Sequence, residues 1–393
     1  MSDDAIVIAS AKRTPIGAFQ GALSTVPAPR LGATAIKAAL DQCHVTADEV
    51  SEVIMGCVLP AGVGQAPARQ AALAAGLPNS IGCTTINKVC GSGMKAVALA
   101  HDLIRAGSAD IVVAGGMESM SLAPYLLPKA RAGMRMGHQQ ALDHMFYDGL
   151  QNPYDGEMMG TFAEATAERY KFSREQQDEF ATRSVKRACQ AIESGAFRNE
   201  IAAVTVSSRR GDTIVDTDEE PGRADIGKIP ELRPAFRSDG TVTAASSSSI
   251  SDGAAALVIM SADNARQRGL QPLATIAGYC NHAQAPEWFT TAPQQSIAAL
   301  YEKLNWAPGS IDMYEINEAF AVVTMSAMHD LGLGADRVNV NGGACALGHP
   351  IGATGARIIT TLAHTMQQRH AGQGIASLCI GGGEALAMGI TRG

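Results

Sequence analysis

The sequence has no long uninterrupted apolar segment. Within its 393 residues, no window approaches the roughly 18 consecutive apolar residues of a membrane-spanning helix. Its first residues, MSDDAIVIAS, also lack the basic start and long apolar core of a secretory signal. We therefore expect a protein with no membrane partner and a cytoplasmic location.

Basic clusters and metal-binding patterns are missing too. Lysine and arginine number 31 against 38 acidic residues, the net charge is −7, and no Lys/Arg block occurs, so we expect no nucleic-acid partner. The eight cysteines are scattered, without a C-x-x-C pair or a His/Cys cluster at zinc spacing, so we expect no metal. Scattered single cysteines are typical of a reducing compartment.

What is present is an alternation of strand-like and helix-like segments. The first part contains AIVIAS, LGATAIKAAL, EVIMGCVL and DIVVAGG, and the pattern returns from residue 271 with LATIAGYC, SIAALYEKL and IASLCIGGG. Such alternation predicts an α/β fold. SGMKAVALAHDLI also resembles TGARIITTLAHTM about 262 residues later, which predicts two similar halves around a shared cleft.

Residues 121–250 interrupt the alternation. They include the helix-like stretch SREQQDEFATRSVKRACQAIESG, with Ser173 as its expected N-cap and Gly195 as its stop. We predict a first half in residues 1–120 that is completed by residues 251–270, a loop domain in 121–250 that covers the cleft, and a second half in 271–393. For the outer part of the insertion, a solvated excursion used for oligomer contacts is the alternative.

The stretch NKVCGSGMKAVALA places Cys90 at the start of an expected helix. The thiolate is the reactive form of cysteine, and a helix N-terminus favours its negative charge. Gly91 and Gly93 would let a substrate come close to the sulfur. On this stretch alone, a buried cysteine that only fills space ahead of the helix is the alternative.

Three further stretches carry candidate catalytic groups. NVNGGACALGHPIGATGAR puts His349 ahead of the matching helix of the second half, and a cysteine beside a histidine is the basic arrangement of an activated sulfur nucleophile. SLCIGGGEALAM places Cys379 before glycines whose N–H groups suit an oxyanion hole. In EINEAFA, Asn317 would either cap the following helix or hold a water or a substrate carbonyl.

Together with GGMESMSLAPY and SISDGAAALV, these stretches resemble the thiolase family over nearly the whole chain. The resemblance implies a five-layered α/β/α/β/α subunit of two similar halves with an inserted loop domain, assembled as a homotetramer. It implies the condensation of two acetyl-CoA to acetoacetyl-CoA and CoA, and the reverse thiolysis, through an acyl-cysteine intermediate. It also implies no cofactor, since the coenzyme A thioesters are substrates.

The resemblance assigns roles by motif. Cys90 would be acylated, His349 would activate it, and Cys379 would exchange the α-proton of the acetyl group. His349 and a water held by Asn317 would stabilise one thioester oxyanion, and the N–H groups of Cys90 and Gly381 would stabilise the other. The positions implied to contact coenzyme A or the acyl group, the tunnel around it included, are Ser248, Ala244, Arg223, Leu150, Met159, Ala319 and Phe320.

Some positions depart from the family's short-chain pattern. Met158 stands where a histidine is common, Phe289 and Thr290 stand where a Met-Gly pair is common, and serines fill positions 246–249. These departures leave the acyl chain-length preference open. The rival functions are a ketoacyl synthase acting on carrier-protein thioesters, a non-catalytic acyl-CoA-binding protein and a cysteine hydrolase.

Overall fold

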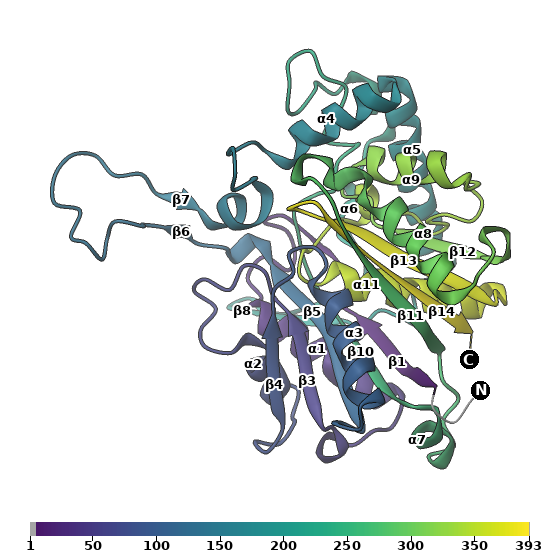
Figure 1. Ribbon diagram of the computed structural model, residues 1–393. Helices are drawn as coiled ribbons and strands as arrows, with labels where there is room; N and C mark the ends of the chain where they lie inside the picture. Colours follow the sequence, from purple (N-terminus) through teal and green to yellow (C-terminus); the bar gives the residue numbers. More distant parts are fainter. Residues whose placement is uncertain (1–4, 393) are drawn as a thin grey trace.

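The computed structural model describes residues 5–392, which form two halves around a mixed β-sheet (Figure 1). In the first half the strand order is β4-β3-β5-β10-β1, with β3 parallel to both of its neighbours and β10 antiparallel to both of its own. β5 and β10 are buried along nearly their whole lengths, because packed elements cover both of their faces. The bounds are β1 Ile6–Arg13, β3 Glu52–Gly56, β4 Gly82–Ile86, β5 Ile111–Ser119 and β10 Ser251–Ser261, with the short β2 Gly17–Ala18 beside β10.

The second half repeats this topology. Its order is β12-β13-β14-β11, which corresponds to β3-β5-β10-β1, and the pairing directions correspond as well. A parallel bridge between Tyr314 and Val338 stands where β4 pairs with β3 in the first half. The predicted duplication is therefore present in the topology. The bounds are β11 Ala274–Ala283, β12 Met313–Ile316, β13 Gln373–Ile380 and β14 Glu384–Arg392.

Helices form three layers around the two halves of the sheet. α1 (Ala28–Gln42) and α2 (Pro67–Ala74) cover the outer face of the first half, and α8 (Ala292–Leu304) and α9 (Ala321–Leu331) lie outside the second half. α3 (Ser92–Arg105) and α11 (Thr354–Arg369) pack together between the halves. The expected five-layered α/β fold is confirmed.

Glycines set the distance between the two central helices. A Cβ atom on Gly93 would lie 2.8 Å from the backbone nitrogen of Ala356, and one on Gly355 would overlap the backbone of Met94. Since no other residue lacks a Cβ, the two helix starts can approach this closely only with glycine at these positions. The starts of α3 and α11 are therefore held side by side, and these helices follow Cys90 and His349 in the sequence.

The insertion leaves the sheet at Ser119 and returns at Asp252, which are paired across β5 and β10. Its main helices, α4 (Met159–Tyr170) and α5 (Arg174–Ser194), lie above the second half in Figure 1. The predicted cap is confirmed, because the Ser173 hydroxyl accepts from the N–H of Gln176 and Gly195 ends α5 in a left-handed conformation. The smaller elements are η3 Phe146–Leu150, β8 Val204–Ser208, β9 Gly211–Val215, α6 Glu219–Arg223 and η4 Ile226–Glu231.

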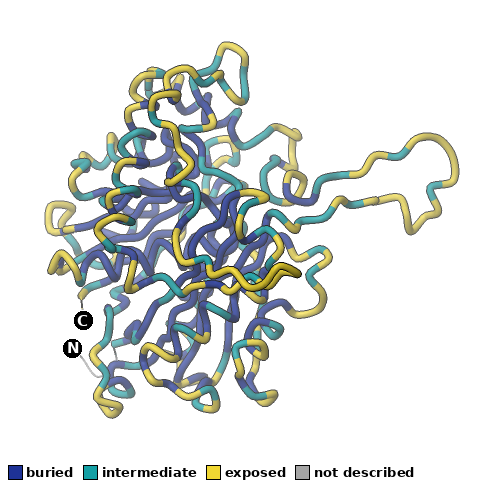
Figure 2. Tube along the Cα trace, turned by 180° about the vertical axis from the view of Figure 1, so that it is seen from behind, coloured by how far each residue is buried: buried dark blue, intermediate teal, exposed yellow. Residues whose placement is uncertain are grey.

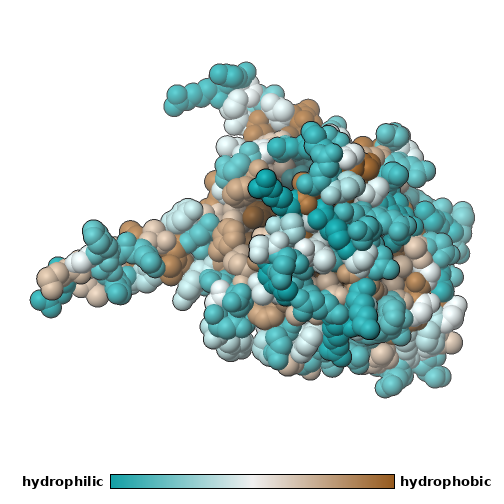
Figure 3. All heavy atoms as spheres, turned by 90° about the horizontal axis from the view of Figure 1, so that it is seen from above, coloured by the Kyte–Doolittle hydropathy of each residue, from teal (hydrophilic) through white to brown (hydrophobic). Residues whose placement is uncertain are grey.

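Residues 125–143, named the arm below, project far from the body of the protein. β6 (Tyr125–Leu126) and β7 (Leu142–Asp143) form its stem, and Figure 2 shows that most of its length is exposed. Large side chains are exposed along it, including Tyr125 at 68%, Leu127 at 52% and Met136 at 91%. Figure 3 shows hydrophobic residues on the surface of this projection. Among residues 5–392, no helix has both the length and the apolar character needed to cross a membrane.

Candidate active site

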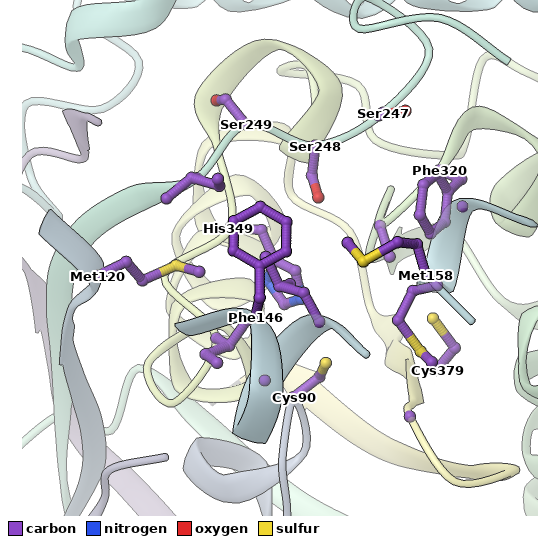
Figure 4. Close-up of a pocket in the computed structure, with 18 of the residues that line it drawn as sticks. Cys90, Met120, Phe146, Met158, Ser247, Ser248, Ser249, Phe320, His349 and Cys379 are labelled. Carbon is purple, nitrogen blue, oxygen red and sulfur yellow. The ribbon is translucent and has the colours of Figure 1, made fainter. Parts of the chain in front are cut away.

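An apolar cavity of about 210 Å³ that opens to solvent lies where the insertion meets the two halves (Figure 4). Cys90 of the first half and His349, Cys379 and Gly381 of the second half all line it. The structure thus brings together four of the five predicted catalytic residues. The other lining residues, most of them apolar, are Met120, Phe146, Gly149, Leu150, Met158, Met159, Gly160, Phe236, Ser247, Ser248, Ser249, Ile250, Phe289, Ala319, Phe320 and Ile351.

The turn before Cys90 has an unusual backbone. Val89 has a φ of +45°, a left-handed conformation that is costly for a β-branched residue. Local hydrogen bonds hold it: the Val89 N–H donates to Oδ1 of Asn87 at 2.9 Å, and the Ser92 hydroxyl donates to the Val89 carbonyl at 2.7 Å. The Ser92 oxygen also accepts from the N–H of Lys88 at 2.8 Å. This turn delivers Cys90 to the cavity immediately before α3.

The turns that carry the two cysteines are in contact. A Cβ atom on Gly91 would lie 2.5 Å from Cδ1 of Ile380, so the glycine lets the Cys90 turn pack closely against the Ile380 side chain at the end of β13. Lys88 and Glu384 form an ion pair between the same two turns. The contacts fix the Cys90 turn against the strand that carries Cys379.

His349 has a defined hydrogen-bonding environment. Its Nδ1 atom lies 2.6 Å from Oγ1 of Thr354, and that hydroxyl lies 3.0 Å from the carbonyl of Pro350. Because the hydroxyl proton goes to the carbonyl, the hydroxyl oxygen is left to accept from Nδ1–H. The proton therefore sits on Nδ1, and Nε2 keeps a free lone pair. Nε2 is buried and has no hydrogen-bond partner within residues 5–392.

Both members of the Cys90–His349 pair are neutral at neutral pH. Cys90 opens to the cavity but is otherwise enclosed by protein; this burial raises the pKa of its thiol to about 11, although the N–H groups of Gly381 and of Cys90 itself oppose the shift. Burial also lowers the pKa of His349 to about 3, with a smaller contribution from the charge of Arg357. The helix start thus does not leave a resting thiolate at Cys90, which corrects the expectation from the sequence.

Cys379 is buried at the end of β13, in an apolar cluster with Phe289 and Phe320. Burial raises the pKa of its thiol well above the ordinary value, and the nearby Cys90 sulfur raises it further. The two sulfurs are therefore close enough to interact electrostatically. The turn that follows Cys379 has left-handed glycines, Gly382 at a φ of 96° and Gly383 at 92°.

Asn317 is buried but is not among the residues that line the cavity. Of the two roles considered for it, the helix cap is excluded, because α9 begins at Ala321 with Phe320 at the cap position. Neither Oδ1 nor Nδ2 of Asn317 has a hydrogen-bond partner within residues 5–392. Buried amides are normally paired, often with ordered water, so this side chain is suited to holding one.

The residues expected to contact coenzyme A divide into two groups. Ser248 lines the cavity together with Leu150, Met159, Ala319 and Phe320. Ala244 and Arg223 do not line it, and Arg223 forms an ion pair at 3.2 Å with Glu219, four residues earlier on α6. The structure therefore does not bring these two residues to the cavity.

Other residues of the site were not found from the sequence. Phe146 begins the short helix η3 and Phe236 lies in an irregular part of the insertion, and no motif or periodicity marks either residue. Of the noted departures from the family pattern, Met158, Phe289, Ser247, Ser248 and Ser249 line the cavity. Thr290 is buried beside it and bonds Thr166 at 2.6 Å. The departures are thus a useful signal for five wall residues.

Comparisons with known proteins agree along the whole chain. Residues 6–263 match the family described as "Thiolase, N-terminal domain", and residues 270–392 match "Thiolase, C-terminal domain". The chain is 48% identical to an acetyl-CoA acetyltransferase of Pseudomonas aeruginosa, over 98% of this chain and 99% of the relative. It is 51% identical to acetyl-CoA acetyltransferase 2 of Arabidopsis thaliana, over 98% of this chain and 96% of the relative. The crystal structure of the Bacillus anthracis acetyl-CoA acetyltransferase superposes with a TM-score of 0.96 at 42% identity, covering 99% of this chain and 98% of that one.

Proposed function

This chain belongs to the thiolase family, and from that premise we propose that it is an acetyl-CoA acetyltransferase. It condenses two acetyl-CoA molecules to acetoacetyl-CoA and CoA, and it catalyses the reverse thiolysis. The observation that carries the proposal is that two cysteines and a histidine, contributed by both halves, open into one apolar cavity. Its substrates are accordingly acetyl-CoA, acetoacetyl-CoA and CoA.

In the first step, the Cys90 sulfur attacks the carbonyl carbon of acetyl-CoA while its proton passes to Nε2 of His349. The free lone pair of Nε2 supports this assignment. The carbon–sulfur bond to CoA breaks, and the departing thiolate takes the proton of Cys379. Acetyl-Cys90 remains, with a Cys379 thiolate and a protonated His349 that balance each other's charge.

In the second step, the Cys379 thiolate removes an α-proton from a second acetyl-CoA. The carbanion attacks the acetyl carbonyl on Cys90, a carbon–carbon bond forms, and the Cys90 sulfur leaves and regains its proton from His349. The N–H groups of Cys90 and Gly381, which face the Cys90 sulfur, would stabilise the oxyanion on the acetyl group. His349 and a water on Asn317 would stabilise the oxyanion of the thioester that supplies the carbanion.

An assay with purified protein tests the function and its rivals. Acetoacetyl-CoA and CoA should be converted to two equivalents of acetyl-CoA, and [¹⁴C]acetyl-CoA should label Cys90. Release of free acetate without acetoacetyl-CoA would instead identify a hydrolase. Activity only with carrier-protein thioesters would identify a ketoacyl synthase, and binding without turnover would identify a non-catalytic protein.

We further propose that the enzyme is a homotetramer built as a dimer of dimers. Two features support this assembly. β4 is the terminal strand of its sheet and leaves an open edge to which a second copy could pair. The arm exposes Tyr125, Leu127 and Met136 far from the body, where a single subunit cannot bury them.

The proposed steps draw on the substrates and this chain's own residues, so we propose that no cofactor takes part. In residues 5–392, no group of three or more His, Cys, Asp or Glu side chains is arranged to hold a metal ion. Dialysis against EDTA should leave the rate unchanged. The eight cysteines are all free, which supports a cytoplasmic location for the enzyme.

A further inference from the structure

Glu118, near the end of β5, has a fully buried carboxylate. Its Oε2 atom accepts hydrogen bonds from the N–H groups of Val58 at 3.0 Å and Gly352 at 2.9 Å, and its Oε1 atom accepts from the N–H of Leu59 at 3.1 Å. The Cys57 thiol lies 3.8 Å from Oε1. Within residues 5–392, no lysine, arginine or histidine pairs with this carboxylate. Burying a carboxylate without a cation costs free energy, so the position of Glu118 calls for a functional explanation.

The donors come from both halves of the protein. Val58 and Leu59 follow β3 of the first half, whereas Gly352 precedes α11 of the second half. The backbones are also in close contact here: a Cβ atom on Gly56 would lie 2.8 Å from the carbonyl oxygen of Gly352, and one on Gly116 would overlap that oxygen. Glu118 thus joins the halves at a point where glycines permit their main chains to touch.

This junction lies beside the reactive groups. Gly352 is three residues after His349, and Ile351 between them lines the cavity. Ile351 also packs with Val58 and Leu59 in one apolar cluster, against which Cys90 rests. A shift of the 348–353 loop relative to the first half would therefore move the imidazole relative to the Cys90 sulfur.

Direct activation of the thiol does not explain the carboxylate. Burial raises the pKa of Glu118 to about 7, while the three backbone N–H groups favour its charged form. That charge raises the pKa of Cys90, so it disfavours the Cys90 thiolate. Removing the charge should, by electrostatics alone, make Cys90 more reactive.

We propose that Glu118 is a positioning residue that fixes the His349 loop against the first half, so that Nε2 of His349 meets the Cys90 sulfur. The proposal rests on the function proposed above, because it assigns a task within the same site. The physical basis is that one carboxylate accepts hydrogen bonds from three backbone N–H groups on two loops, which fixes the position of one loop relative to the other. Misplacement of a reacting group by about 1 Å can cost on the order of a hundredfold in rate.

The test is the variant Glu118→Gln, measured by the alkylation rate of Cys90 with iodoacetamide, by acetylation of Cys90 from acetyl-CoA, and by kcat and KM in thiolysis. In either orientation the new amide turns its NH2 group toward one or two of the three backbone N–H groups, which loosens the contact. We expect both Cys90 reactions and kcat to fall about tenfold or more, with KM changed less than about twofold. Unchanged or faster Cys90 reactions in the folded variant would overturn the proposal.

Two further variants separate positioning from general stability. Glu164 is a matched control, since it is buried and accepts from the N–H groups of Thr241 and Val242 within the insertion alone. Glu164→Gln should leave the Cys90 alkylation rate near that of the wild type, and an equal loss there would count against the proposal. If Glu118→Gln does not fold, Gly352→Ala decides, because its Cβ atom would lie 2.6 Å from Oε2 of Glu118 and displace the carboxylate. Gly352→Ala should also slow Cys90 alkylation, and a wild-type rate there would overturn the proposal.

The readouts also keep the two proposals apart. Iodoacetamide reports on the Cys90–His349 geometry whatever the natural substrate is. If wild-type enzyme reacts with iodoacetamide but not with acetyl-CoA, the proposed function fails while the role of Glu118 is still tested. If acetyl-CoA labels the wild type and Glu118→Gln equally, only the positioning role fails.

Discussion

The Nδ1 atom of His349 lies 2.6 Å from the Thr354 hydroxyl, which donates its own hydrogen bond to the Pro350 carbonyl. This pair of contacts selects one tautomer of a buried imidazole. Nδ1 carries the proton and Nε2 is left as the acceptor, which is the form required to take a proton from Cys90. Thr354, five positions after the histidine, therefore determines which imidazole nitrogen can accept a proton.

Replacing Thr354 with valine should impair catalysis with little change in shape. Valine keeps the branched form of threonine but offers no acceptor to Nδ1–H, so the imidazole loses its fixed tautomer and orientation. We expect kcat in thiolysis to fall about tenfold to a hundredfold, since a positioned acid–base group contributes at least about a hundredfold. Thr354→Ser keeps the hydroxyl and is the matched control. Equal rates for Thr354→Val and Thr354→Ser would show that the hydroxyl does not orient His349.

The two cysteines should be separable by their partial reactions. Cys379→Ala removes the proposed base but leaves Cys90 and His349 in place. Acetyl-CoA should still acetylate Cys90, because the departing CoA thiolate can take its proton from solvent in place of Cys379. Exchange of acetyl α-protons into D₂O, followed by NMR, should fall by about a hundredfold or more. Cys90→Ser should lose acetylation instead. Rapid α-proton exchange in Cys379→Ala would remove that residue from the base role.

Much of this arrangement could be predicted from the sequence because it is encoded locally and then repeated. Glycines around Cys90, His349 and Cys379 are visible in short motifs, and the resemblance between the halves indicates that their helix starts meet. The α/β alternation and the capped helix at Ser173 follow from similar local signals, whereas the five-layered arrangement is implied only by the resemblance to the thiolase family. Such features need no knowledge of distant contacts.

The remaining features depend on tertiary contacts. Nothing near Glu118 in the sequence shows that Gly352, 234 residues away, donates to it. The raised pKa of Cys90 is likewise a result of burial, which outweighs the favourable helix start that the sequence displays. Arg223 lies in a part of the insertion where neither periodicity nor a motif fixes the position of a residue in the fold.

Shortening the arm should change assembly without unfolding the subunit. The Cα partners Leu126 and Leu142 close its stem, so residues 127–141 can be replaced by an Asn-Gly turn. If the arm joins two dimers, the shortened protein should sediment as a dimer in analytical ultracentrifugation while the wild type sediments as a tetramer. Two proteins of the same subunit number would show that the arm does not join them.

The folding stability of the protein should depend on pH in the way expected of a neutral, buried His349. Its pKa is about 3 in the folded protein against an ordinary value of 6.5, so between these pH values only the unfolded chain binds the proton. Folding stability from this group is present above pH 6.5 and is lost as the pH falls toward 3, at up to about 1.4 kcal/mol per pH unit. The raised pKa of Glu118 changes the folding stability with pH in the opposite direction. This contribution cancels when the wild type is compared with a variant that lacks only His349.

Urea unfolding at pH 6.5 and 4.5 measures this effect. The wild type should lose about 2 kcal/mol more than His349→Gln over that interval. His44→Gln, at an exposed position, is the control and should follow the wild type. Identical pH dependence in the wild type and His349→Gln would mean that His349 does not resist protonation in the folded state.

Phe289 should limit the length of the acyl chain. It lines the cavity, is 3% exposed, and sits edge-on to Phe162 with ring centroids 6.3 Å apart. Phe289→Leu shortens the wall at a stability cost of about 1 kcal/mol and opens space for further methylenes. We expect the ratio of kcat/KM for 3-ketohexanoyl-CoA over acetoacetyl-CoA to rise about tenfold, since each methylene in an apolar pocket is worth about 1–3 kcal/mol.

Phe162→Leu disturbs the same aromatic pair from outside the cavity lining, so it should cost similar stability and leave the ratio unchanged. A ratio that rises equally in both variants would trace the preference to general loosening of the core and not to the wall at Phe289.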